Sequence, residues 1–141
     1  MMIRKPIAQV FQAFIDPAIT THFWFTKSGG PLEMGKTVKW EWEMYGFSVD
    51  VLVKEITAPF KISMEWGDPT TTIDYEFTAL TENTTYVVIK NYGFSQEGDE
   101  LIAAIKDNTG GFTTVLDGLK AWLEHGINLN LIADKFPGLK K

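Results

Sequence analysis

Few side chains in this 141-residue sequence have the types and spacing that catalysis or metal binding requires. The two histidines, His22 and His125, lie far apart and in no HExxH-like motif, which argues against a metal site. No cysteine is present, so disulfides, thiolate catalysis and iron–sulfur clusters are excluded. No serine stands in a GxSxG motif, and Gly29-Gly30 lacks the context of a phosphate loop. The sequence therefore predicts no cofactor and no metal, and it offers no serine nucleophile.

Acidic side chains alternate with apolar ones in several segments, and the alternation predicts that they face solvent. A shift of one residue in the strand register would turn them inward, but it would also expose the tryptophans of the same segments. Paired carboxylates for acid–base catalysis are therefore not predicted. The residues concerned are Glu41, Glu43, Asp50, Glu65, Asp74 and Glu76.

Two polar residues continue an apolar face, and they are the best candidates for contact with a ligand. Asn91 follows Val87 and Ile89 at alternate positions, and Tyr75 lies in a similar apolar series. A buried amide or phenol needs a hydrogen-bond partner, which either another protein group or a ligand can supply. The histidines have simpler expected roles. His22 is predicted to be solvated on a short helix, and His125 to lie at a helix C-terminus, where the helix dipole favours a cation.

The N-terminal region has the spacing of two short helices after the end of a strand at Met1–Lys5. Pro6 suits the first turn of a helix, because its missing N–H would have no partner there. Asp16-Pro17 ends this helix, and Asp16 can cap the second one. The predicted buried residues of the two helices are Ile7, Val10, Phe11, Phe14, Ile19, Phe23 and Trp24.

From Gly35 the apolar residues recur at every second position, which is typical of half-buried strands. The first strand is predicted over 36–45, with Val38, Trp40, Trp42 and Met44 on its apolar face. Short turn sequences separate it from four more strands, so an antiparallel meander is expected. The turns are predicted at Gly46, Ala58-Pro59, Gly67–Pro69 and Glu82-Asn83.

A long amphipathic helix is predicted between Asp99, as its N-cap, and Gly126. Gly110-Gly111 lies inside it and suggests either a kink or a close approach to the backbone. Residues 127–141 are predicted to be a tail that packs back on the rest. A one-faced apolar meander must be covered, and this helix is the one predicted element long enough to cover it.

The space between the sheet and this helix is the predicted ligand site, although the same side chains could equally form a plain core. Large aromatic residues and methionine are common in both settings. The predicted lining consists of Trp40, Trp42, Met44, Met64, Trp66, Tyr75, Val87, Ile89, Asn91, Phe112 and Leu116.

Composition narrows the classes of partner. The formal net charge is −5 and the pI is about 5.0, which argues against nucleic acid and against an anionic membrane surface. No apolar run has the length of a membrane span, and the N-terminus lacks the features of a signal peptide. We expect one domain over residues 1–141, soluble and cytoplasmic.

Several motifs occur in a fixed order along the chain. The first is the run PIAQVFQAFIDPAITTHFWF. It is followed by Gly35, by Pro59-x-x-Ile62-x-x-x-Trp66, by a strand with Thr85, Val87, Ile89, Gly93 and Phe94, and by Gly111-Phe112 with Leu116 and Leu119. Together they resemble the activator of Hsp90 ATPase homologue 1-like family, in the START/Bet v 1-like superfamily. In this chain Phe112 replaces the commoner tryptophan, and only Met1–Lys5 is available for the first strand.

The resemblance implies an α+β helix-grip fold, in which a curved antiparallel sheet wraps a long C-terminal helix behind two short N-terminal helices. It also implies three functions. The first is binding of an apolar or amphipathic small molecule or lipid, without membrane insertion. The second is a protein-interaction module of the co-chaperone type, with a chaperone partner. The third is a cyclase- or hydrolase-like enzyme, the least favoured. A homodimer is possible in each case.

Overall fold

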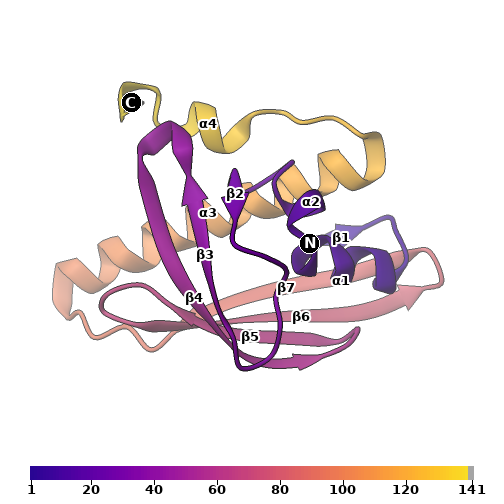
Figure 1. Ribbon diagram of the computed structural model, residues 1–141, viewed down its shortest axis with the longest axis horizontal. Coiled ribbons are helices and arrows are strands. Elements are labelled where there is room, and N and C mark those ends of the chain that lie inside the picture. The colour runs from indigo at the N-terminus through magenta and orange to yellow at the C-terminus, as the bar shows by residue number, and fades with distance from the viewer. Residues whose placement is uncertain (140–141) are drawn as a thin grey trace.

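The computed structural model describes residues 1–139, and in this range the strands form one antiparallel sheet of seven in the order β1-β7-β6-β5-β4-β3-β2. The sheet curves around the long helix α3 (Figure 1), as the helix-grip arrangement requires. The strands are β1 (Met2–Ile3), β2 (Lys27–Ser28), β3 (Thr37–Trp42), β4 (Phe47–Thr57), β5 (Lys61–Trp66), β6 (Thr71–Thr81) and β7 (Thr84–Tyr92).

The predicted meander is confirmed, because β3 to β7 pair in sequence order with the expected turns between them. Register shifts at Val53/Glu55 and at Ala79/Thr81 mark irregularities in β4 and β6, and such bulges bend strands. The concave face is apolar and fully buried along the middle strands. Its residues include Val51, Val53, Ile62, Met64, Ile73, Tyr75 and Val87.

The first predicted strand extends three residues too far at its C-terminal end. β3 ends at Trp42, and Glu43–Tyr45 forms the short 3₁₀ turn η1, which closes at Gly46 with a φ of 60°. A turn of this kind replaces alternation with a tight bend, so Met44 does not continue the inward face of β3. β2 was also not predicted, because its two residues are too few to show a period.

The two short N-terminal helices form as the proline and aspartate signals predict. α1 covers Ile7–Ile15 and α2 covers Pro17–Thr20. The Asp16 carboxylate accepts a hydrogen bond of 2.9 Å from the Ala18 backbone N–H, which caps α2. Phe23 and Trp24 are buried just after α2 ends, in the segment that turns towards the sheet.

The long helix α3 covers Gly98–His125 and runs without interruption through Gly110-Gly111. Its N-cap is Glu97 instead of the predicted Asp99, which falls in the first turn beside Glu100. An acidic first turn complements the positive end of the helix dipole, so Asp99 stabilises the helix from a different position. Gly126, with a φ of 65°, ends the helix as expected.

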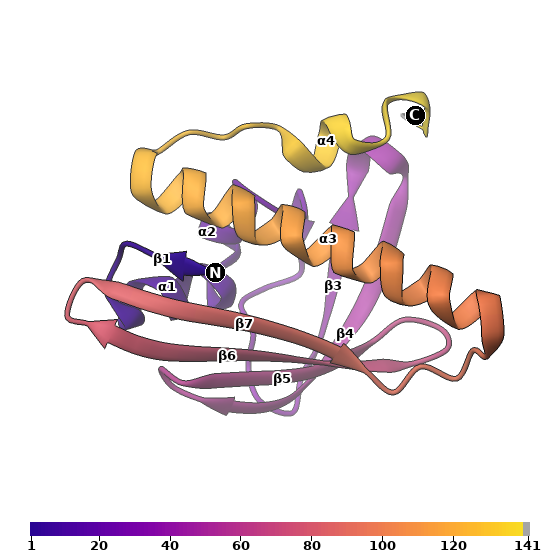
Figure 2. The same cartoon turned by 180° about the vertical axis from the view of Figure 1, so that it is seen from behind.

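α3 lies across the concave face of the sheet (Figure 2), but only its C-terminal half is deeply packed. Its buried residues are Phe112, Val115, Gly118 and Leu119. In the first turns, by contrast, Ile102 and Ile105 are 65% and 47% exposed. The C-terminal half of the helix thus packs into the core, whereas its first turns are largely exposed.

Gly118 is where α3 approaches another segment most closely among its glycines. A Cβ atom there would lie 3.1 Å from the Phe23 Cβ and 3.2 Å from the Phe23 carbonyl oxygen. Gly111, which the sequence singled out, has nothing within 4 Å of the same position. The close backbone approach is therefore about two helical turns further along α3 than predicted.

After Gly126 the chain returns along α3 to the tip of the β3–β4 hairpin (Figure 1). It forms α4 (Leu131–Lys135) and the 3₁₀ turn η2 (Pro137–Leu139). The Tyr45 hydroxyl of η1 donates to the carbonyl of Ile132 and also lies 3.2 Å from that of Ala133. Ile132 packs against the core.

Leucine substitutions at Gly111 and Gly118 compare the open and the closely packed positions of α3. Leucine raises intrinsic helix stability by about 0.8 kcal/mol relative to glycine. Gly111→Leu should therefore keep or raise the free energy of unfolding. Gly118→Leu should lower it by at least about 1 kcal/mol, since overpacking against Phe23 outweighs that gain. Urea unfolding followed by circular dichroism measures both variants, and equal stabilities would contradict the packing described.

Candidate ligand-binding groove

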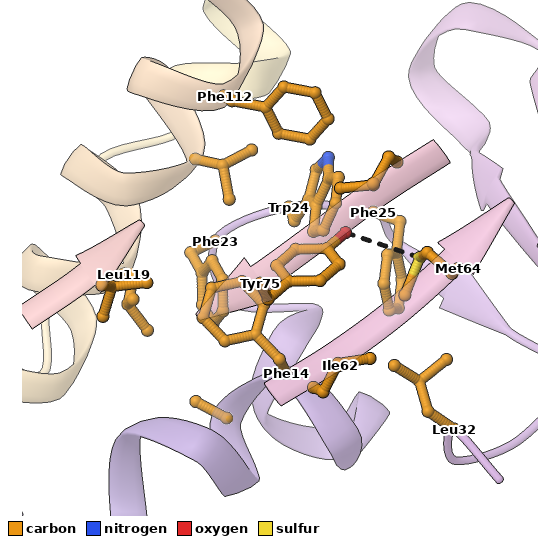
Figure 3. Packing of buried hydrophobic residues seen from close by; sticks show 14 of the residues in the cluster. Phe14, Phe23, Trp24, Phe25, Leu32, Ile62, Met64, Tyr75, Phe112 and Leu119 are labelled. Carbon is orange, nitrogen blue, oxygen red and sulfur yellow. Dashed lines mark hydrogen bonds between the residues drawn. The ribbon is translucent and has the colours of Figure 1, made fainter. Parts of the chain in front are cut away.

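Trp24 is the centre of an aromatic cluster between the sheet and α3. Its ring centroid lies 4.9 Å from that of Trp40, 6.1 Å from that of Trp66 and 5.9 Å from that of Phe112. Most of these pairs meet edge to face or tilted, the arrangements that the quadrupoles of aromatic rings favour. Figure 3 shows Trp24 between Phe112 on the helix and Tyr75 on the sheet. The cluster fixes the depth at which α3 sits.

An open hollow of about 400 Å³ lies beside this cluster, and we name it the aromatic groove. It is bounded by the β3–β4 hairpin, the end of β5, the middle of α3 and the tail. Seven aromatic side chains line it, namely Trp24, Trp42, Tyr45, Phe47, Trp66, Phe112 and Phe136. A space of this size with such walls is typical of small-molecule sites.

The remaining lining of the aromatic groove is apolar at its base and polar at one side. Gly111, Val115 and Ile132 are apolar, whereas Asp107, Asn108 and Lys135 supply polar groups. The Lys135 ammonium donates to the Thr114 hydroxyl at 3.1 Å and lies 5.9 Å from the centroid of the Phe136 ring. The groove can therefore enclose an apolar body and leave a polar end near water.

Two more hollows adjoin α3 between Ala104 and Leu116, and Asn108 borders all three. The Asn91 hollow, of about 360 Å³, lies between the end of β7 and α3 and shares Phe112 with the aromatic groove. The Gln96 hollow, of about 230 Å³, lies under Ala104 and shares Trp66 and Phe47 with the groove. The middle of α3 thus borders a series of neighbouring hollows.

The side-chain NH₂ group of Asn91 has hydrogen-bond partners, whereas its side-chain oxygen has none among residues 1–139. Its Nδ2 group donates to the Thr71 hydroxyl at 2.9 Å and to the Thr72 carbonyl at 2.8 Å. Its Oδ1 atom is buried and has no partner among residues 1–139, and the same is true of the Gln96 Oε1 atom. A buried acceptor without a partner costs about 1–3 kcal/mol.

The predicted lining residues fall into four groups instead of one. Trp42, Trp66 and Phe112 line the aromatic groove, while Ile89, Asn91, Leu116 and again Phe112 line the Asn91 hollow. Met44 borders a smaller space of about 120 Å³ under the tail, together with His22. The others are fully buried in the core, namely Trp40, Met64, Tyr75 and Val87. Trp24 packs against both Trp40 and Tyr75, on the core side of the groove.

Sequence reasoning missed the contributions of η1 and of the tail to the groove. Period-two alternation places Tyr45 on the polar face of the predicted strand 36–45 and Phe47 on the apolar face of the next strand, yet Phe47 is 56% exposed and lines the groove. Lys135 and Phe136 belong to a segment whose position no local pattern indicates. The turn signal at Gly46 was the one available hint that the side chains around it change direction.

Two polar residues differ from their predicted solvent exposure. Asp74 is only 8% exposed, because its carboxylate accepts hydrogen bonds from the Ser63 hydroxyl at 2.6 Å and from the Tyr92 hydroxyl at 2.9 Å. His22 is half-buried and stacks on Trp122, with ring centroids 3.8 Å apart. Within residues 1–139, no three His, Asp or Glu side chains are grouped so that they could hold a metal ion.

These features define a class, a helix-grip protein with an apolar hollow beside its long helix. The family described as activator of Hsp90 ATPase homolog 1-like protein matches residues 4–124, and the chain belongs to this family. A comparison with curated protein sequences found no significant match. Across the described part of the chain, no helix is both long and apolar enough to span a membrane.

Solved structures share the fold. Protein SSP2350 from Staphylococcus saprophyticus is 26% identical, with a TM-score of 0.80 over 92% of this chain and 91% of that one. The Aha1 dimer from Colwellia psychrerythraea is 19% identical, with a TM-score of 0.72 over 89% and 93%. PFC0360w, an HSP90 activator from Plasmodium falciparum, is 20% identical, with a TM-score of 0.61 over 79% and 86%.

Removing the Tyr45 hydroxyl should release the tail from the hairpin. Tyr45→Phe keeps the ring but loses the bonds to Ile132 and Ala133, together with the one that the Phe136 N–H donates to the hydroxyl at 3.3 Å. Amides of 131–136 should then exchange with deuterium at least about tenfold faster, which corresponds to a loss of about 1.4 kcal/mol. Amides of β6 serve as the internal reference, and unchanged exchange in 131–136 would contradict the proposed attachment.

The Tyr75 hydroxyl should contribute little to stability. Its one hydrogen bond goes to the Met64 sulfur at 3.5 Å, a weak acceptor (Figure 3). Tyr75→Phe should therefore change the free energy of unfolding by less than about 1 kcal/mol. A loss above about 2 kcal/mol would show a stronger partner than Met64.

The same substitution should alter the response to alkali. Burial raises the pKa of the Tyr75 phenol well above its ordinary value of 10.0. The pKa of this phenol is higher in the folded state than in the unfolded state. Its contribution to the free energy of unfolding is therefore complete below pH 10 and is lost as the pH rises above 10. The free energy of unfolding, measured with urea at several values from pH 9 to pH 11, should thus fall more steeply for the wild type than for Tyr75→Phe. An equal dependence on pH in both proteins would contradict the burial of this hydroxyl.

Proposed function

We propose that this protein binds an apolar or amphipathic small molecule in the aromatic groove. The observation that carries the proposal is an open hollow of about 400 Å³ with seven aromatic side chains in its wall. Aromatic surface exposed to water is costly, and a ligand that covers it gains about 25 cal/mol for each Å² of apolar surface removed from water. The polar side of the groove, with Asp107 and Lys135, supports a ligand that keeps a polar group near solvent.

The position of the groove beside the middle of α3, next to the loosely packed N-terminal half, also supports binding. Ligand entry requires side chains that can move, and Phe47 and Phe136 are both about half exposed. The deeply buried side chains behind them, such as Tyr75 and Met64, supply a rigid floor. An exposed rim over a buried base is suited to apolar ligands of differing shape.

Gly111→Leu tests this proposal because it fills the groove without disturbing the core. Gly111 lines the groove, and a side chain placed there meets no atom within 4 Å of its Cβ. Nile red, an apolar dye whose emission rises away from water, should bind the wild type. The variant should weaken binding by at least about tenfold, or 1.4 kcal/mol.

Gly110→Leu is the matched control, with the same gain in helix propensity. Its Cβ would lie 3.7 Å from the Lys135 ammonium, an ordinary contact, and Gly110 does not line the groove. This variant should bind Nile red as the wild type does. If the wild type binds no dye, or if Gly111→Leu binds it unchanged, the proposal is wrong.

A second candidate function is stimulation of an Hsp90 ATPase. Membership of the family supports it, and one structure of similar fold is described as an HSP90 activator. The exposed Ile102 and Ile105 on α3 offer apolar surface for such a partner. If the wild type and Gly111→Leu stimulate the ATPase of purified Hsp90 equally, this function does not require the groove.

A further inference from the structure

From the open edge of β7 beside the Asn91 hollow, we infer that this hollow binds an extended peptide segment of another protein, which pairs with β7 as an added strand. The segment has apolar side chains at alternate positions and basic residues between them. Its site is a different hollow from the aromatic groove, so the inference does not depend on small-molecule binding there.

The edge of β7 that faces β1 is paired only near its start. β1 pairs with β7 at Thr85 and Tyr86. The Met1 carbonyl accepts a hydrogen bond of 2.9 Å from the Val87 N–H, and the Met1 amino group donates one of 2.8 Å to the Val87 carbonyl. Within residues 1–139 no other strand lies on this side of β7. The edge is therefore open over residues 88–92.

Two N–H and two C=O groups of this open edge point away from the sheet. Along an antiparallel strand, the N–H and C=O of one residue face one neighbour, and those of the next residue face the other neighbour. Val87 directs both groups to β1, so those of Ile89 and Asn91 point to the same side. Val88 and Lys90 bond to β6 instead. An unpaired edge of this kind is a template for an added strand, whose affinity comes from main-chain hydrogen bonds.

The Asn91 hollow continues the line of β1. β1 lies between β7 and the C-terminal half of α3 (Figure 2), where the Lys120 ammonium donates to the Met2 carbonyl at 2.9 Å. Further along the same gap, the hollow of about 360 Å³ separates the end of β7 from α3 between Ile105 and Leu116. A strand thus fills one end of the gap, and the other end is a hollow with the same unpaired edge along its side.

The walls of the hollow specify the side chains of the segment. Residues directly opposite each other in antiparallel strands project on the same face of the sheet. Those opposite Ile89 and Asn91 would therefore point towards α3, where the wall is apolar. It includes Phe94, Leu116 and Ile105, the last of which is 47% exposed. Apolar side chains at alternate positions would cover this surface, while the residues between them face solvent.

The charges at the end of the hollow favour a basic segment. Glu97, Asp99 and Glu100 are exposed where the chain passes from β7 into α3. Asp107 adds a further carboxylate to the first half of α3, where Lys106 is the one basic residue. Opposite charge on the partner speeds association and disfavours acidic competitors.

A seven-residue peptide that alternates lysine and valine, Lys-Val-Lys-Val-Lys-Val-Lys, is the probe. Fluorescence polarisation of its fluorescein-labelled form should give a Kd below about 1 mM, and a weaker Kd would overturn the inference. The peptide Lys-Lys-Val-Val-Val-Lys-Lys has the same charge without the alternation. It should bind at least about fivefold more weakly, and equal binding would show attraction by charge alone.

N-methylation of the peptide separates strand pairing from side-chain contact. Valines opposite Ile89 and Asn91 direct their N–H groups to β7, whereas the lysine N–H groups point away from it. Methylating the valine nitrogens should therefore weaken binding at least about tenfold, and methylating the lysine nitrogens should change it by less than about threefold. Equal losses would rule out pairing with β7.

A substitution on α3 tests the location. Ile105→Lys places a charge in the wall of the hollow and should weaken binding at least about tenfold. Ala103→Lys is the matched control, because Ala103 is exposed and does not line the hollow. It adds the same charge and should change binding by less than about threefold. Equal effects of the two substitutions would contradict the location.

Hydrogen exchange of the wild type identifies the occupant of the edge. In the free protein, the amides of Ile89 and Asn91 should exchange at least about tenfold faster than those of Val88 and Lys90. The alternating peptide should slow the first pair at least about tenfold and leave the second pair unchanged. Peptide binding without this protection would overturn the inference. Protection that appears without peptide as the protein concentration rises would assign the edge to a second copy of this chain and would also overturn it.

Discussion

The contact between Gly118 and Phe23 is the constraint on which the rest of the structure depends. The absence of a side chain at Gly118 lets α3 approach the segment after α2 so closely that a Cβ atom would lie 3.1 Å from that of Phe23. This contact, with Val115 and Leu119 beside it, anchors the C-terminal half of the helix in the core. A rigid helix anchored at one end cannot also follow a curved sheet at the other end. The first turns of α3 therefore remain above the sheet.

The aromatic cluster limits how far the space under those turns can close. Trp24 contacts rings from β3, β5, β6 and α3, and Phe112 rests on both Trp24 and Trp66. Planar rings of this size fill the middle of the interface and leave hollows on either side of Phe112. The tail closes one of these hollows through Tyr45, while Asn91 borders the other. The same packing that stabilises the fold thus creates the candidate site.

Much of the fold could be predicted from local patterns, because the alternation in β3 to β7 and the helical spacing of α3 are strong signals. The prediction failed where a few residues interrupt a pattern. Gly46 converts the end of a strand into η1 and removes Met44 from the inward face. At the start of α3, the true N-cap Glu97 makes no side-chain capping bond, so no sequence signal marks it.

The candidate site was less predictable than the fold. How deeply a side chain is buried depends on contacts between residues that are distant in sequence. Trp40 and Trp42 share one face of β3, yet Trp40 is sealed by Phe25 and Trp24 whereas Trp42 lines the groove. Period-two alternation indicates the face of a side chain and not what covers it. Phe136 reaches the groove only because the tail turns back at Gly126, a direction that no local residue preference specifies.

The indole N–H signals of the tryptophans in a ¹⁵N–¹H spectrum test the location of the ligand most directly. Trp24, Trp42 and Trp66 line the aromatic groove, whereas Trp122 stacks on His22 away from it. On titration with dodecyl methyl ether, the signals of Trp24, Trp42 and Trp66 should shift together in a saturable manner while that of Trp122 stays in place. A saturable shift confined to Trp122, or no shift at any tryptophan, would contradict the account.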